Sequence, residues 1–420
     1  MEFNKDQLPP LMAHLGSEMQ LLICCARIEM VNPFQNHMTQ LIDSGLDWGT
    51  LLPMAKRHGM VALLHKHLTI LNEKELDCIV PQVFIGKLHK ETKSQAIRQL
   101  FLTSRMVKIS RILAENDIPH LHYKGIILDH LLYGGQMLRP TSDMDILVKK
   151  EDVLSIKKLL FDQGYHSLHM SGEDEIAEQI WLKYKKDYAF IHPRNNHMIE
   201  VHWQLTTSEI STEIGWSYLQ PVYQSVELNG QWLQTLSRED TYLTLCTHGA
   251  RHRFERLRWI CDLSQFILLN PDIDWSIIMN RSETAGVKRM VLLGSHLATN
   301  LLGANLLLDI GPSYLSGMTT PSQLIEHLSI DTCHTLSTEL DSSAKATRYG
   351  FEIRLLDSWQ QRVSYLVYIV RKLSSRDVHQ HDEHPILGPY HYVRRAFQII
   401  QRRGLGTLLT TLGQMIRSLR

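Results

Sequence analysis

The chain has 420 residues, and its 44 lysines and arginines balance its 44 aspartates and glutamates, so the formal net charge is zero. A neutral chain does not coat nucleic acid by bulk attraction, although a local basic patch can still contact it. With 44% hydrophobic and 21% charged residues, the composition is that of an ordinary globular protein and excludes global disorder, and the length allows about two or three domains.

Six cysteines are spread along the chain without a CxxC pair, namely Cys24, Cys25, Cys78, Cys246, Cys261 and Cys333. This spacing predicts neither a disulfide framework nor a zinc ribbon, and we expect reduced, mostly buried thiols in a cytoplasmic protein. The charged N-terminal residues do not resemble a signal peptide, and no apolar run approaches the roughly 18 residues of a membrane span.

The first part of the sequence predicts helices. Apolar residues recur at helical spacing over 19–30 and 48–71, and a long helix is expected over 90–116. From residue 237 onward the pattern is helical again, starting with the capping sequence Ser237-Arg238-Glu239-Asp240.

In the middle of the chain the pattern changes from helices alone to strands that alternate with helices. Residues 118–123 and 143–148 predict strands, and helices are expected over 126–133 and 151–163. Two more extended runs, 184–192 and 197–205, are joined by the turn-forming residues 193–196 and predict a hairpin. The fold class is therefore α+β, with an N-terminal helical region over 1–115, an α/β core over 116–235 and a C-terminal helical domain over 236–420.

Two pairs of polar residues carry the strongest chemical signal. Asp143 and Asp145 are two positions apart on one predicted strand, so their carboxylates share a face. Neighbouring carboxylates repel each other unless a cation lies between them, and Mg²⁺ prefers such oxygen ligands. Glu200 and His202 repeat this spacing on a later strand, so Glu200 becomes a third acid if the two strands are neighbours.

Phosphate-binding residues are expected upstream of these acids. Lys124 and Gly125 lie where a strand enters a helix, and a glycine there lets backbone N–H groups approach an anion at the helix N-terminus. Lys124 could add a positive charge to a triphosphate. Arg139 and Ser142, which precede the acids, could also hold phosphate oxygens.

Taken together, these motifs resemble the nucleotidyltransferases of the DNA polymerase β superfamily. The match is narrower with a bacterial family of mostly uncharacterised nucleotidyltransferases, over about residues 100–270. It includes the Leu132-Tyr133 pair, the run Ser142-Asp143-Met144-Asp145-Ile146-Leu147-Val148, the motif Glu200-Val201-His202-Trp203 and the downstream segments 245–252 and 256–263.

The resemblance implies a small mixed β-sheet core and the transfer of a nucleoside monophosphate from a nucleoside triphosphate to an acceptor. It implies that Asp143, Asp145 and Glu200 are catalytic and bind two Mg²⁺ ions, with Mn²⁺ as a possible substitute. It also implies that Gly125 is the phosphate-loop residue, and with it Lys124, Arg139 and Ser142 are the expected nucleotide-binding residues.

Several features leave alternatives open. His202, His248, His252, Arg256 and Asp262 are candidates to line the cleft or contact a substrate; the two histidines at 248 and 252 could also simply pack together on one helix face. The segment 384–420 carries six arginines and no acid, so it could contact RNA, a membrane surface or an acidic partner.

The acceptor is also open. A small molecule, a peptide and RNA all fit. The segment Arg139-Pro140-Thr141-Ser142-Asp143 is similar to abortive-infection nucleotidyltransferases, which suggests a toxin-like enzyme that modifies tRNA or protein, and the large helical flanks suit a small-molecule or peptide acceptor equally well. The non-enzymatic alternative is a module that binds a nucleotide without turning it over.

Overall fold

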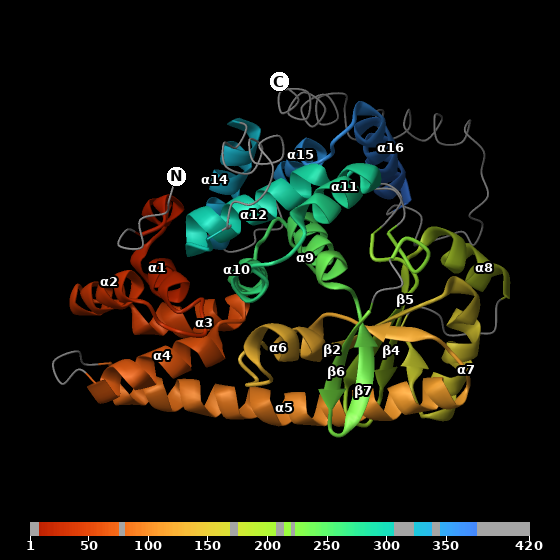
Figure 1. The fold of residues 1–420 in the computed structure, drawn as a ribbon, viewed down its shortest axis with the longest axis horizontal. Helices are drawn as coiled ribbons and strands as arrows, with labels where there is room; N and C mark the ends of the chain where they lie inside the picture. The colour runs from red at the N-terminus through yellow and green to blue at the C-terminus, as the bar shows by residue number, and fades with distance from the viewer. Residues whose placement is uncertain are drawn as a thin grey trace.

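Figure 1 shows a computed structural model of the chain, which describes residues 8–74, 80–168, 175–206, 214–219, 223–305, 323–337 and 345–375. Helical regions on either side of a small mixed sheet confirm the expected α+β class. Cys78 and the basic segment 384–420 lie outside the described residues.

The chain begins with a compact group of helices. They are η1 (Pro10–His14), α1 (Ser17–Cys24), α2 (Asn32–Asp43), α3 (Trp48–His58), α4 (Val61–Lys74) and α5 (Gln82–Glu115). Helix α5 has 34 residues and contacts α4 as well as the central sheet, so it runs along the base of both parts of the molecule (Figure 1).

Two of the helices predicted here are shorter than their apolar patterns. The pattern over 48–71 is divided between α3 and α4, because Gly59 takes a left-handed conformation with φ of 69° and ends α3. The pattern over 19–30 ends as a helix at Cys24, where Arg27 Nε donates to the carbonyl oxygen of Cys24 at 3.0 Å. This bond satisfies one of the carbonyls that a helix end leaves open.

The central sheet has five strands in the order β1-β2-β5-β4-β3. Their bounds are β1 (His120–His122), β2 (Asp143–Val148), β3 (His166–Ser167), β4 (Asp187–His192) and β5 (His197–His202). Strands β2 and β5 are parallel, and the other pairs are antiparallel. The expected hairpin is present as β4 and β5, with His192 opposite His197.

Helices α6 (Gly125–Tyr133), η2 (Lys150–Asp152), α7 (Val153–Asp162) and α8 (Glu175–Tyr184) connect these strands, and β6 (Gln224–Leu228) and β7 (Gln231–Thr235) form a separate two-stranded sheet. The C-terminal helices are α9 (Arg238–Arg251), α10 (Leu257–Leu269), α11 (Trp275–Ala285), α12 (Lys288–Leu302), α14 (Gln323–Ser337), α15 (Lys345–Arg354) and α16 (Trp359–Ser375).

Two hydrophobic clusters make up most of the core. One contains the inward residues of the sheet, such as Met144, Ile146, Ile199 and Val201, packed against α5 and α7. The larger one joins apolar residues of the N-terminal helices to those of α9–α16, so the helical regions before and after the sheet share one core. Helix α10 also contacts α6, which brings the C-terminal helices to the sheet.

The described cysteines, Cys24, Cys25, Cys246, Cys261 and Cys333, are buried and free, as the sequence predicted. Among the described helices, none combines the length and the apolar character needed to cross a membrane.

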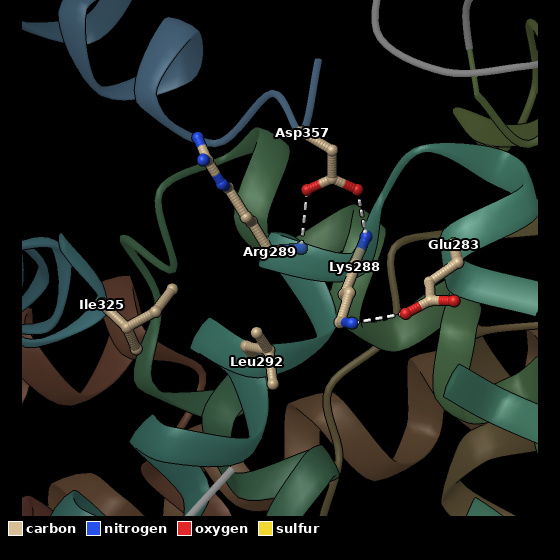
Figure 2. A pocket seen from close by; sticks show the side chains of 6 residues that line it. All are labelled: Glu283, Lys288, Arg289, Leu292, Ile325 and Asp357. Carbon is tan, nitrogen blue, oxygen red and sulfur yellow. Dashed lines mark hydrogen bonds and ion pairs between the residues drawn. The ribbon is translucent and has the colours of Figure 1, made fainter. Parts of the chain in front are cut away.

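A pocket of about 360 Å³ lies at the start of α12 (Figure 2). The carboxylate of Asp357 accepts hydrogen bonds from the backbone N–H groups of Lys288 at 2.6 Å and Arg289 at 3.0 Å, so it caps the helix. Lys288 pairs with Glu283, and the Arg289 guanidinium donates to the carbonyl of Leu356 at 2.9 Å. The charged groups that line this pocket therefore bind to the protein itself. Their hydrogen bonds attach the segment before α16 to the start of α12.

Candidate active site

The acids of β2 and β5 lie beside each other. In the parallel pairing of these strands, Asp145 is directly opposite Glu200 and Leu147 is opposite His202. Met144, Ile146, Ile199 and Val201, the alternate residues, are buried in the core beneath them. Strand alternation thus places the acids on one face and the anchoring apolar side chains on the other.

Asp145, Glu200 and His202 form a group suited to a metal ion. One ligand atom from each lies within 4.8 Å of the other two. His202 Nε2 is 3.1 Å from Asp145 Oδ1 and 3.2 Å from Glu200 Oε2. Two carboxylates and an imidazole are a donor set that divalent cations accept, so the residues present fit the expected metal. Glu200 remains 29% exposed, which leaves the group open to solvent.

Asp143 lies at the start of β2, two residues before Asp145, and is not part of this three-residue group. Burial, together with the charges of Asp145 and Glu200, raises the pKa of Asp143 to about 6. Burial is the larger cause, and repulsion from the carboxylates of Asp145 and Glu200 adds to it. The repulsion is what a bound cation would relieve.

Lys124 supplies the positive charge that balances Asp145. Its Nζ lies 3.0 Å from Asp145 Oδ1. Although burial acts to raise the pKa of Asp145, the Lys124 ammonium and the bond to His202 hold it well below its usual range. Lys124 has φ of 62°, a left-handed conformation that is uncommon for a residue with a side chain, and it immediately precedes α6.

Gly125 starts α6 with φ of 42°, and a Cβ there would lie 3.1 Å from Thr141 Cγ2 and 3.4 Å from the carbonyl oxygen of Asp143. The position therefore needs a glycine for its conformation and for the close approach of the segment that enters β2. Ser142, in that same segment, is exposed.

Arg139 is buried behind this turn. Its Nε donates to both carboxylate oxygens of Asp262 at 3.0 Å, and its Nη1 donates to the carbonyl of Gly125 at 3.3 Å. Asp262 is fully buried and also accepts a bond from the Tyr133 hydroxyl at 2.9 Å. These bonds link α10 to α6. In the structure Arg139 and Asp262 are thus partners of each other.

His248 and His252 lie one turn apart on α9 and its C-cap, with ring centroids 4.9 Å apart, and both rings are about 5.2 Å from the ring of Trp259. Burial, the Lys124 charge and nearby cations lower the pKa of His248 well below its usual range. Arg256 is exposed, with its guanidinium 5.8 Å from the Trp259 ring.

Sequence reasoning missed Lys186 and Asp187, which approach the outer nitrogen of His202. Asp187 Oδ2 is 3.6 Å and Lys186 Nζ is 3.4 Å from His202 Nδ1. The predicted hairpin contained the signal. If His192 pairs with His197 beside the turn, five positions further from the turn Asp187 lies opposite His202. A carboxylate behind a histidine orients its ring toward a metal or another partner.

Comparison with known proteins agrees with this geometry. A family model described as an uncharacterised nucleotidyltransferase matches residues 44–303, well over half of the chain. Searches of curated proteins and of solved structures give no match. The match spans the glycine turn, the acids of β2 and β5 and the buried Arg139–Asp262 pair, and the chain therefore belongs to this family of uncharacterised nucleotidyltransferases.

Proposed function

We propose that the protein transfers a nucleoside monophosphate from a nucleoside triphosphate to a hydroxyl or another nucleophile of an acceptor. The acceptor hydroxyl gives its proton to a base, for which Glu200 is the candidate, and its oxygen forms a bond to the α-phosphorus while the bond from that phosphorus to the leaving pyrophosphate breaks. The observation that carries the proposal is the direct pairing of Asp145 and Glu200 on parallel strands, beside a glycine turn, in a chain of a nucleotidyltransferase family.

Each residue of the site has a role in this proposal. Asp143, Asp145 and Glu200 hold the divalent ions, for which Mg²⁺ is the natural candidate, and the imidazole of His202 adjoins them. When bound, the ions neutralise charge on the triphosphate and make the acceptor hydroxyl easier to deprotonate. The backbone at Gly125 approaches the phosphates at the start of α6.

Lys124 changes partner in this scheme. In the structure its ammonium neutralises Asp145, which otherwise would be a buried carboxylate with no cation. A metal ion held by Asp145 would neutralise that carboxylate in place of Lys124, and the Lys124 ammonium could then bind a phosphate oxygen. Positioning and charge compensation, rather than covalent chemistry by the protein, then account for the rate.

The test has two stages. We expect at least one of the four nucleoside triphosphates to raise the unfolding temperature only when Mg²⁺ or Mn²⁺ is present. Label from the α-phosphate should then move to an acceptor in a cell extract, with release of pyrophosphate. The double variant Asp143→Ala/Asp145→Ala should lose the transfer and keep its circular dichroism spectrum.

Undiminished transfer by the double variant would refute the proposed roles of the acids. Metal-dependent binding of nucleotide without any pyrophosphate release would instead identify a non-catalytic nucleotide-binding module. A labelled product sensitive to ribonuclease or to protease would point to the toxin-like alternative, in which RNA or protein is the acceptor.

A further inference from the structure

Arg258 is an inward-lying cation without an ion pair. It is the second residue of α10 and is half-buried. Its Nη1 donates to the carbonyl oxygen of Pro140 at 3.1 Å, whereas its Nε is buried and has no hydrogen-bond partner among the described residues. Within the described part of the chain, no carboxylate lies within ion-pair distance of its guanidinium.

Two other inward-lying arginines have an ion-pair partner. Arg139 is paired with Asp262 at 3.0 Å, and Arg281 is paired with Asp240 at 2.8 Å. Asp262, the acid whose charge acts on Arg258 most strongly, is already taken up by Arg139 and Tyr133. A partly buried charge with an unsatisfied donor is costly to keep, and a bound anion would complete it.

The position of Arg258 places this charge at the acid site. Pro140 belongs to the segment that leads into β2, three residues before Asp143. Arg258 and Asp143 each shift the pKa of the other, and Arg258 also acts on His248, as Lys124 does. Arg258 therefore contacts the segment that enters β2, and Lys124 pairs with Asp145 on that strand at 3.0 Å.

The N-terminal helices hold Arg258 there. A Cβ on Gly59 would lie 2.7 Å from Arg258 Cδ, so the absence of a side chain at Gly59 makes room for the arginine stem. The buried His58 accepts a hydrogen bond at its Nδ1 from the backbone N–H of Leu257, at 3.2 Å. The end of α3 therefore fixes the first turn of α10, from which Arg258 projects.

We propose that Arg258 binds the polyphosphate chain of the nucleotide, together with Lys124, and that Gly59 and His58 position it. The inference rests on the proposed function and deepens it. A polyphosphate fits better than a single carboxylate, because it carries several negative charges and a guanidinium can bind two phosphate oxygens at once. The N-terminal helical region thereby becomes part of the nucleotide site.

Inorganic tripolyphosphate is the probe, because it has the polyphosphate chain of a nucleotide without a base, so the base preference of the protein need not be known. Isothermal titration calorimetry with Mg²⁺ compares the wild type with Arg258→Gln, Arg258→Lys and the control Arg238→Gln, which alters an exposed arginine at the far end of α9. We expect Arg258→Gln to lower the affinity about 10- to 100-fold, Arg258→Lys to lower it less, and the control to match the wild type.

The unfolding temperature without ligand separates binding from a purely structural role. Because Arg258 is uncompensated in the empty site, Arg258→Gln should unfold at the wild-type temperature or above it. A fall in unfolding temperature with unchanged affinity in the folded Arg258→Lys variant would make the arginine structural and overturn the proposal. Wild-type affinity in Arg258→Gln would overturn it and leave the proposed function standing. If the wild type bound neither tripolyphosphate nor any nucleoside triphosphate, both would fail.

Discussion

The buried pair of Asp262 and Arg139 joins the C-terminal helices to the glycine turn, and its loss should lower the free energy of unfolding substantially. Asp262 is fully buried and accepts three hydrogen bonds, two from Arg139 Nε at 3.0 Å and one from the Tyr133 hydroxyl at 2.9 Å. In Asp262→Asn the shape is kept, but Arg139 loses its counter-ion while it stays buried. Breaking such a pair costs about 3–5 kcal/mol of unfolding free energy.

Urea denaturation followed by circular dichroism measures this cost. Asp272→Asn is the matched control, because that acid pairs with Arg238 on the surface, and we expect no measurable change there. Replacing both partners, as in Arg139→Met with Asp262→Leu, should recover part of the loss, because no buried charge is then unpaired. If Asp262→Asn had the same free energy of unfolding as the control variant, the claim that this pair holds α10 to α6 would be refuted.

Three further predictions follow from the site and the core. Gly125→Ala should destabilise the protein by about 1–2 kcal/mol, since the position has φ of 42° and a Cβ would lie 3.1 Å from Thr141 Cγ2. It should also reduce nucleotide transfer by more than this loss of stability explains. Urea denaturation measures the first effect and pyrophosphate release the second. Burial lowers the pKa of His122 to about 3, so the folded protein excludes a proton that the unfolded chain takes up below about pH 6.5, and stability should fall with decreasing pH by about 1.4 kcal/mol per unit from this residue. His122→Phe should flatten that pH dependence, and an unchanged slope would contradict it. Asp145→Ala should abolish Mn²⁺ binding in a calorimetric titration, whereas binding at wild-type strength would place the metal elsewhere.

Local sequence signals predicted the parts of the fold in which periodicity and turn chemistry agree. The patterns over 143–148 and 197–205 predicted both acid-bearing strands, β2 and β5, and the turn at 193–196 predicted that β4 is the hairpin partner of β5. The α+β class is confirmed for the same reason. The adjacency of β2 and β5 was a conditional expectation from the sequence, because parallel pairing has no local signal, and the structure shows it.

What the sequence did not indicate depends on contacts between distant segments. The pairing of Arg139 with Asp262 joins residues 123 positions apart, and the room that Gly59 makes for Arg258 joins two separate helical regions. A run of arginines over 251–258 looks uniform in the sequence. Only packing distinguishes the exposed Arg256 from Arg258, which is half-buried and whose Nε is buried without a hydrogen-bond partner among the described residues.

The roles of the acids stay predictions until a metal is located. The structure adds His202 to the acids predicted from the sequence, as a third side chain with a ligand atom close to those of Asp145 and Glu200. A nitrogen ligand makes Mn²⁺ a useful probe beside Mg²⁺, since imidazole binds transition metals readily.

The most direct measurement is anomalous X-ray diffraction from a crystal of the protein soaked with Mn²⁺ and a non-hydrolysable nucleoside triphosphate. We expect a manganese peak in contact with the carboxylates of Asp145 and Glu200, with the triphosphate bound beside the start of α6. Nucleotide bound elsewhere, or manganese with no contact to either carboxylate, would contradict the account.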